Sequence, residues 1–190
     1  MNIKDIIYER RTIRKFTDRK VSDSDLNYLI DLARMAPSGS NMQPLKYAIV
    51  NQEDNVQKVF KLTKWAGYLK GKGSPDETER PTAFIIVLND EEIRKEGYEL
   101  DAGASIQNIL LGATEKGIGT AWLGAIDRDE IRNILEIPMR FRIISAIALG
   151  YANYKTVIEE EKGDIKYYLD NDDVLHIPKR KNSDIIVLTK

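Results

Sequence analysis

Four cations lie close together near the start of the chain, in the stretch ERRTIRKF, which contains Arg10, Arg11, Arg14 and Lys15. A guanidinium group can form two parallel hydrogen bonds with a phosphate, and Thr12 adds a hydroxyl to the same stretch. Alternatively, the cations follow the C-terminal end of a helix, where the macrodipole favours positive charge by about 0.3–1 kcal/mol. One arginine would satisfy that role. The residue types are therefore equally consistent with a small-anion site and with cations that stabilise a helix end.

A second polar stretch, PSGSNMQP, also carries many hydrogen-bonding groups. Taken alone, its proline, glycine, serine and asparagine residues are explained most simply by an ordinary turn after a helix. Its hydroxyls and amides would also suit the rim of a heteroaromatic ring, where amides pair with carbonyl and ring nitrogen atoms. The residues that could do so are Ser38, Ser40, Asn41 and Gln43.

The residue types that are missing exclude several kinds of chemistry. The chain contains no cysteine, which excludes a disulfide, a thiol nucleophile and a cysteine-ligated iron–sulfur cluster. Its one histidine, His176, cannot build the multi-histidine sites that are common for zinc, so we expect no metal site. If the protein performs redox chemistry, it requires an organic cofactor.

The glycine pattern in KGIGTAWLG does not indicate a dinucleotide-binding fold. That fingerprint follows a strand and opens a helix. Here the glycines follow a predicted helix and lead into a predicted strand, which is the reverse order. Gly117 is better explained as the residue that ends the long helix.

The charge balance argues against a nucleic-acid-binding protein. The 29 lysines and arginines are matched by 30 acidic residues, which leaves no general basic field. No apolar run approaches the roughly 20 residues that span a bilayer, and the first residues lack the apolar stretch of a secretory signal. We therefore expect a cytoplasmic protein, and the length of 190 residues favours a single domain over residues 1–190.

Hydrophobic periodicity predicts a sheet wrapped by helices. The expected helices cover residues 3–10, 22–36, 55–68, 98–116 and 127–136. The expected strands cover residues 46–51, 82–90, 117–126 and 142–152. Because these elements lack the regular short spacing of a doubly wound βαβ sheet, we expect an α+β fold.

The chain changes character after Tyr151. Residues 153–184 are polar, and IKYYLDNDDVLHI predicts a hairpin with its turn at Asn171 and Asp172. The apolar stretch DIIVL near the C-terminus predicts a last, isolated strand. One interpretation of that strand is an ordinary sheet edge.

Four stretches together resemble the nitroreductase family of flavoproteins, in the family's order and spacing: RRTIRKF, APSGSNMQP, DAGASIQNILLGATEKGIGTAWLG and PKRK. The resemblance implies a nitroreductase-like α+β fold, with a central mixed or antiparallel sheet flanked by helices. It also implies a non-covalent FMN cofactor and a homodimer with FMN sites at the interface. In this family C-terminal arms extend over the partner subunit, which would bury the last strand by adding it to the partner's sheet.

The resemblance also transfers roles to individual residues. The FMN phosphate and ribityl chain would be bound by Arg10, Arg11, Thr12 and Arg14, with Arg180 and either Lys179 or Lys181. From the opposite subunit, the flavin would be reached by Pro37, Ser38, Ser40, Asn41 and the further candidate Gln43. The neighbours of the flavin ring would be Trp122, Leu123 and Gly124.

The segment from Trp65 to Arg80 matches no family pattern. Trp65, Tyr68 and Leu69 are equally consistent with the substrate mouth and with packing on the core. The resemblance implies ping-pong hydride transfer from NAD(P)H through FMN to a flat acceptor such as a nitroaromatic or a quinone, without a catalytic side chain. The alternatives are reductive dehalogenation, breakdown of the flavin, and a sensory flavin protein without turnover.

Overall fold

The continuous apolar run forms β2 (Ala83–Asp90), an inner strand of the main sheet, and all of its residues are buried. The structure is a computed structural model that describes residues 2–69 and 71–190. Strand β2 pairs antiparallel with β1 (Leu45–Val50) on one side and with β4 (Phe141–Gly150) on the other. Strand β3 (Gly119–Leu123) is antiparallel to β4, which gives the order β1-β2-β4-β3. The predicted central sheet is confirmed, and of the two predicted forms, mixed or antiparallel, it has the antiparallel one.

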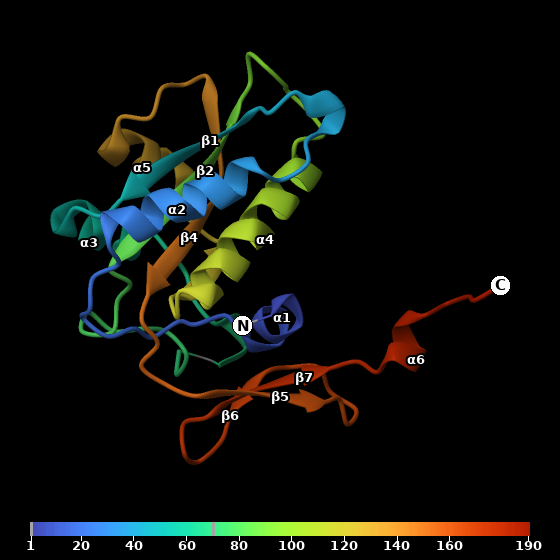
Figure 1. Ribbon diagram of the computed structural model, residues 1–190. Coiled ribbons are helices and arrows are strands. Elements are labelled where there is room, and N and C mark those ends of the chain that lie inside the picture. Colours follow the sequence, from blue (N-terminus) through green and yellow to red (C-terminus); the bar gives the residue numbers. More distant parts are fainter. Residues whose placement is uncertain (1, 70) are drawn as a thin grey trace.

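Helices cover both faces of this sheet, as Figure 1 shows for α2 and α4, which cross in front of it. From the N-terminus the helices are α1 (Ile3–Glu9), α2 (Asp23–Arg34), α3 (Glu53–Lys61), α4 (Glu99–Glu115), α5 (Arg128–Leu135) and α6 (Asn182–Ile185). Two short 3₁₀ helices, η1 (Gly39–Asn41) and η2 (Gly67–Leu69), lie between them.

The core is divided into two layers by the alternation of side chains along β2. Phe84 and Ile86 face a cluster that includes residues of α3 and α5. Ile85 and Val87 face the opposite cluster, which includes the apolar faces of α2 and α4. A sheet with helices packed on both faces confirms the predicted α+β fold class.

Short-range sequence signals set several helix ends. Ser22 accepts a hydrogen bond from the Asp25 backbone N–H at 3.1 Å and begins α2. Asp127 accepts one from the Glu130 N–H at 3.1 Å and begins α5. Gly117, with φ of 69°, follows the last residues of α4 in the left-handed region that favours glycine.

The prediction of one helix over residues 55–68 is partly wrong. Helix α3 begins at Glu53 and ends at Lys61. Beyond it, Thr63 forms a bridge with Ile126, and the Lys64 N–H donates to the Ala125 carbonyl at 2.9 Å. Pairing with the loop after β3 therefore competes successfully with the helical spacing of the apolar residues.

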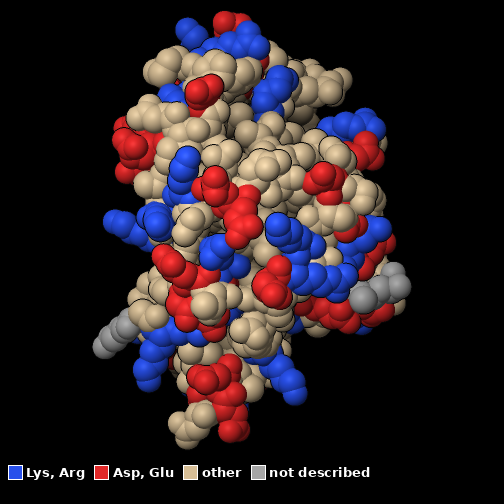
Figure 2. Space-filling model, turned by 90° about the vertical axis from the view of Figure 1, so that its left-hand side faces the viewer, with Lys and Arg blue, Asp and Glu red and all other residues tan. Residues whose placement is uncertain are grey.

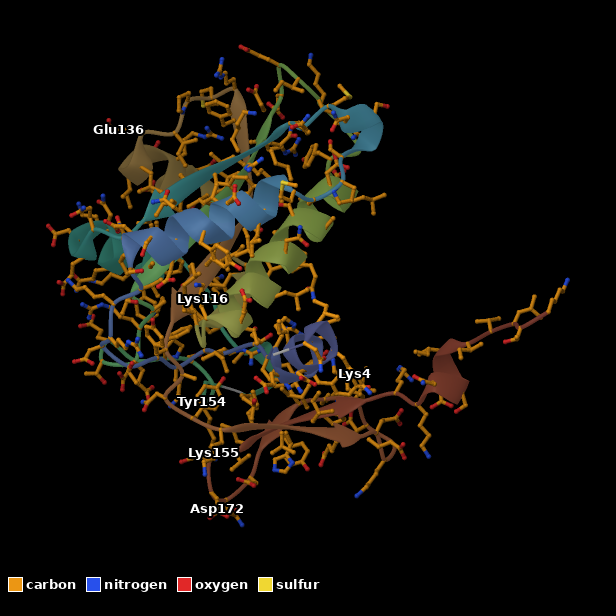
Figure 3. All side chains as sticks on the ribbon, in the orientation of Figure 1. Lys4, Lys116, Glu136, Tyr154, Lys155 and Asp172 are labelled. Carbon is orange, nitrogen blue, oxygen red and sulfur yellow. The ribbon has the colours of Figure 1, made fainter. Side chains whose placement is uncertain are left out.

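A second, smaller sheet follows β4 and lies below α1 in the view of Figure 1. Strand β7 (Leu175–Lys179) pairs antiparallel with β6 (Tyr168–Leu169) and parallel with β5 (Thr156–Glu160). The β6–β7 pair confirms the predicted hairpin, and Figure 3 shows Asp172 at its tip. The polar composition of β5 hides this strand from pattern-based prediction.

The prediction of a strand over residues 184–188 is wrong within this chain. Helix α6 occupies residues 182–185, and residues 186–190 adopt no regular secondary structure. Figure 1 shows this C-terminal segment extending away from both sheets. A strand requires a neighbouring backbone to satisfy its hydrogen-bonding groups, and the segment has no such neighbour within the described residues.

Charges of both signs are interspersed over the molecular face in Figure 2. That face has no continuous basic stripe of the kind that follows a nucleic-acid backbone. Across residues 2–69 and 71–190, the helices are all too short or too polar to cross a membrane.

His176 lies between two carboxylates in the second sheet. Its Nδ1 is 3.2 Å from Glu159 Oε2, and its Nε2 is 3.0 Å from Asp170 Oδ2. The ring stacks on Tyr168 with a centroid separation of 4.8 Å, and the Tyr168 hydroxyl donates to Glu159 Oε1 at 2.9 Å. The hydrogen bond with Asp170, followed by that with Glu159, raises the pKa of His176 above its usual value.

We expect the second sheet to lose stability as the pH rises above about 6.5, the usual pKa of histidine. Because the folded-state pKa of His176 is raised, its contribution is fully present below the unfolded pKa of about 6.5 and disappears as the pH rises through the folded value. The pKa of Glu159 and that of Asp170 are lowered by their hydrogen bonds, so their contributions disappear only as the pH falls through those lowered values. Proton NMR titration of His176, the sole histidine, measures its folded-state pKa directly. A midpoint at or below that of the urea-unfolded chain would contradict it, and His176→Gln should abolish the basic-side loss.

Candidate functional site

The arginine-rich stretch runs beside β3. Thr12 forms a parallel bridge with Thr120, and the Ile13 N–H donates to the Thr120 carbonyl at 2.8 Å. Farther along, the Thr17 N–H donates to the Tyr151 carbonyl at 2.8 Å. These contacts bring the predicted phosphate-binding residues and the predicted flavin-ring neighbours to the same edge of the main sheet.

Two glycines make this close approach sterically feasible. Gly119 of β3 and Gly150 of β4 are paired across the sheet. A Cβ added at Gly119 would lie 2.9 Å from the Cβ of Ile13, and one added at Gly150 would lie 2.8 Å from a ring carbon of Phe16. The Cβ of Ile13 cannot rotate away from its own backbone. Any larger residue at 119 must therefore displace the segment that carries the arginines.

Tyr154 fastens the same segment from the other side. Its hydroxyl accepts a hydrogen bond from the Arg14 N–H at 3.1 Å and donates one to the Thr12 carbonyl at 3.3 Å. Burial raises the pKa of Tyr154, so the hydroxyl keeps the proton that it donates. Figure 3 shows Tyr154 where the chain passes from the main sheet to the second sheet. No local motif in the sequence marks this residue.

The three arginines occupy different environments. The Arg11 guanidinium donates to the carbonyls of Tyr8 and Arg10, at the C-terminal end of α1. Arg11 therefore performs the helix-end role that composition alone left open. The Arg14 guanidinium lies 4.6 Å from the centroid of the Tyr167 ring, where a cation–π attraction holds it.

In the described part of the chain, these arginines lack carboxylate partners. Within residues 2–69 and 71–190, no ion pair includes Arg10, Arg11 or Arg14. Burial lowers the pKa of Arg10. The pKa of Arg11 is lowered mainly by burial and, to a smaller extent, by the positive charge of Arg10. Both shifts show that the local environment disfavours uncompensated positive charge. A bound anion would supply the compensation, so the donor set fits a phosphate group.

The end of β3 presents an ordered aromatic side chain. Trp122 is 47% exposed, and its indole Nε1–H donates to Ser145 Oγ at 3.0 Å. Leu123 is buried, and the carbonyl of the following Gly124 accepts from Arg128 Nη2 at 3.1 Å. Ser145 and Arg128 thus hold two of the predicted flavin neighbours. Ser145 is 23 positions from Trp122, too far along the chain for a motif to reveal it.

Residues 37–43 lie elsewhere. In Figure 1 the segment containing η1 is at the end of α4 remote from α1. All of these residues are exposed except Ser38, which is half-buried. Within one chain, this group of predicted flavin ligands therefore lies apart from the arginine-rich stretch.

The C-terminal basic stretch is partly neutralised. Arg180 Nη1 is 3.9 Å from Glu161 Oε2, and Lys181 Nζ is 3.1 Å from Glu160 Oε1. Lys179 ends β7 and has no ion pair within the described residues. Arg180 and Lys181 thus have carboxylate partners in this chain, unlike Arg10 and Arg14 within the described residues, and their assignment to the FMN phosphate stays a prediction.

The three candidates for the substrate mouth also differ in their surroundings. Trp65 packs against Phe60 beside the core, and its Nε1–H donates to Thr63 Oγ1 at 2.8 Å. Tyr68 is 61% exposed and lies against the ring of Tyr167. Leu69 lines a small cavity of about 150 Å³, which also borders Arg14 and Tyr154.

The chain is similar to known proteins over most of its length. The family model described as Nitroreductase family matches residues 7–151. An Archaeoglobus fulgidus protein with the provisional name NADH dehydrogenase/NAD(P)H nitroreductase is 33% identical over 153 residues, covering 77% of this chain and 83% of that protein. The Bacillus subtilis FMN reductase (NAD(P)H) is 24% identical over 164 residues, covering 75% and 63%. A crystal structure from Desulfovibrio desulfuricans, provisionally described as a nitroreductase in complex with FMN, shares the fold with a TM-score of 0.70, 23% identity and coverage of 100% and 98%.

We expect Gly119→Ala to displace the arginine-rich stretch from β3. The added methyl group would overlap Ile13, and overpacking of this kind lowers the free energy of unfolding by about 1–3 kcal/mol. Urea denaturation measures the change. Gly67→Ala is the control, since a Cβ there meets nothing within 4 Å. Equal stability of the two variants would show that close approach at Gly119 is unimportant.

Proposed function

Because the chain belongs to the nitroreductase family, we infer that it is an FMN-dependent oxidoreductase that takes electrons from NAD(P)H. The observation that carries this function is the arginine-rich stretch beside β3, where partly desolvated guanidinium groups have no carboxylate partner within the described residues. A phosphate group is the natural ligand of such a donor set. The exposed indole of Trp122 on the same strand offers a flat surface for an aromatic ring.

Different residues would bind different parts of FMN. Arg10, Thr12 and Arg14 would bind its phosphate and ribityl chain, while Trp122 and Gly124 would flank the ring. When bound, FMN supplies hydride transfer from NAD(P)H to a flat acceptor such as a nitroaromatic or a quinone. The protein would orient NAD(P)H and then the acceptor on the same exposed face of the flavin, which corresponds to ping-pong kinetics. No side chain is required as a general acid or base.

A homodimer is part of this proposal. Residues 37–43 are remote from the arginine-rich stretch of their own chain, so they would meet the flavin bound by a partner subunit. The C-terminal segment supports the same arrangement, because Val187 is 98% exposed and Leu188 is 67% exposed. A second copy of the chain would cover these apolar side chains.

We expect Arg10→Ala to weaken FMN binding by roughly ten- to a hundredfold. A hydrogen bond to a charged group contributes about 1.5–3 kcal/mol, and about 1.4 kcal/mol corresponds to a tenfold change in affinity. Quenching of flavin fluorescence during titration of the apoprotein measures the dissociation constant. Arg142→Ala is a suitable control, because that exposed arginine pairs with Glu91 on the surface. Unchanged affinity for both Arg10→Ala and Arg14→Ala would overturn the assignment of the phosphate site.

The function itself is tested by the visible spectrum of the purified protein, followed by anaerobic addition of NADH and NADPH in separate samples. We expect a flavin spectrum that bleaches with at least one donor, and reoxidation by menadione or a nitrofuran with steady consumption of that donor. A bound flavin that resists both donors would favour a sensory protein. Release of halide from a halogenated aromatic would favour reductive dehalogenation, whereas failure to bind FMN would contradict the proposal.

A further inference from the structure

Asp101 is a buried carboxylate near the start of α4 with no role in the electron transfer proposed above. Its side chain is 9% exposed, and three donors surround it. Oδ2 accepts from the Ser38 hydroxyl at 2.8 Å and from Arg94 Nη1 at 3.2 Å, and Oδ1 accepts from the Gly39 N–H at 3.1 Å. Two of these donors belong to the loop of residues 37–43.

Few other interactions hold this loop. It contains no fully buried residue, and a cavity of about 260 Å³ lies beside it, bordered by Ser38, Gln43 and Asp101. Ser40, Asn41 and Gln43 have φ values of 53°, 55° and 50°, in the left-handed region that non-glycine residues occupy at some cost. The loop therefore keeps an unfavourable backbone conformation through polar contacts rather than through apolar packing.

Ser38 connects Asp101 to the far end of the loop through two hydrogen bonds. Its hydroxyl proton is donated to Asp101, and the same oxygen accepts from the Gln43 N–H at 3.0 Å. Because a hydroxyl has a single proton, Ser38 has no donor left for a flavin in this conformation. Ser40 and Asn41, whose side chains are exposed, remain available.

Arg94 fixes Asp101 in turn. Its Nε donates to the Glu96 carbonyl at 2.8 Å, and its own carbonyl accepts from the Asn89 side-chain amide at 2.7 Å. Asn89 is fully buried at the end of β2. Gly39 gives the guanidinium room, since a Cβ there would lie 2.6 Å from Nη1. The contacts thus extend from the rigid main sheet through Arg94 and Asp101 to the loop.

We propose that Asp101 is a positioning residue: through Ser38 and Gly39 it holds residues 38–43 in the conformation that meets the flavin of the partner subunit. This inference rests on the proposed function. In it, Ser38 acts on the flavin only through the shape of the loop, and Ser40 and Asn41 make the contacts. The charge of Asp101 is essential, because a neutral side chain cannot compensate Arg94 while accepting from both loop donors.

The first test is the affinity of the full-length apoprotein for FMN. Asp101→Asn keeps the size of the side chain but removes its charge, and we expect a dissociation constant about tenfold higher than that of the wild type. Asp31→Asn, which removes an exposed carboxylate paired with Arg34, should leave it unchanged. Ser38→Ala should weaken binding, and the double variant Asp101→Asn/Ser38→Ala should be no weaker than Asp101→Asn alone, because both changes break one connected unit.

The second test needs no flavin. Hydrogen–deuterium exchange of the apoprotein, followed on peptides that cover residues 37–43, should be faster in Asp101→Asn and in Ser38→Ala than in Asp31→Asn. Exchange in Asp101→Asn and in Ser38→Ala that is no faster than in Asp31→Asn, or FMN affinities equal to that of Asp31→Asn, would overturn the positioning role. If the wild type fails to bind FMN, the proposed function fails, and unchanged exchange would then also refute the hold on the loop. A poorly folded Asp101→Asn would leave Ser38→Ala to decide both measurements.

Discussion

The close contact between residues 12–16 and the glycine pair Gly119–Gly150 is the constraint on which the rest of the site depends. With no side chain at either position, the segment lies flat against the edge of the main sheet, where Ile13 and Phe16 are buried. The contact also fixes the direction of the chain, so the arginines and the end of β3 share one edge. Glycine is required here for the space that it leaves rather than for an unusual backbone angle.

The charges of the arginine-rich stretch contrast with those elsewhere in the molecule. Arg34 Nη2 lies 2.6 Å from Asp31 Oδ1 and Arg94 Nη1 lies 3.2 Å from Asp101 Oδ2, so each of these cations is paired within the chain. The lowered pKa of Arg10 shows the cost of leaving a guanidinium partly desolvated without a counter-charge. A ligand that supplies the missing negative charge stabilises the folded state by mass action. The proposed site would therefore gain affinity for an anion at some expense of the stability of the apoprotein.

Sequence patterns predicted most of the fold because the signals that set its elements are local. The apolar run of β2, the caps at Ser22 and Asp127 and the glycine after α4 each act within a few residues. The errors occur where distant residues decide. Thr63 leaves the helical pattern to pair with Ile126, and the apolar C-terminal segment has no strand to join within its own chain.

The candidate site follows the same division. Its arginines and its glycine-rich strand could be predicted from motifs, whereas Tyr154, Ser145 and Asp101 act through contacts with residues far away in the sequence. Arg14 and Tyr154 are 140 positions apart, and the contact between them holds one end of the candidate anion site. During synthesis, Arg14 must therefore wait for the 140 positions up to Tyr154 before this contact can form. The candidate anion site is therefore completed only after the main sheet that lies between these residues in the sequence has been made.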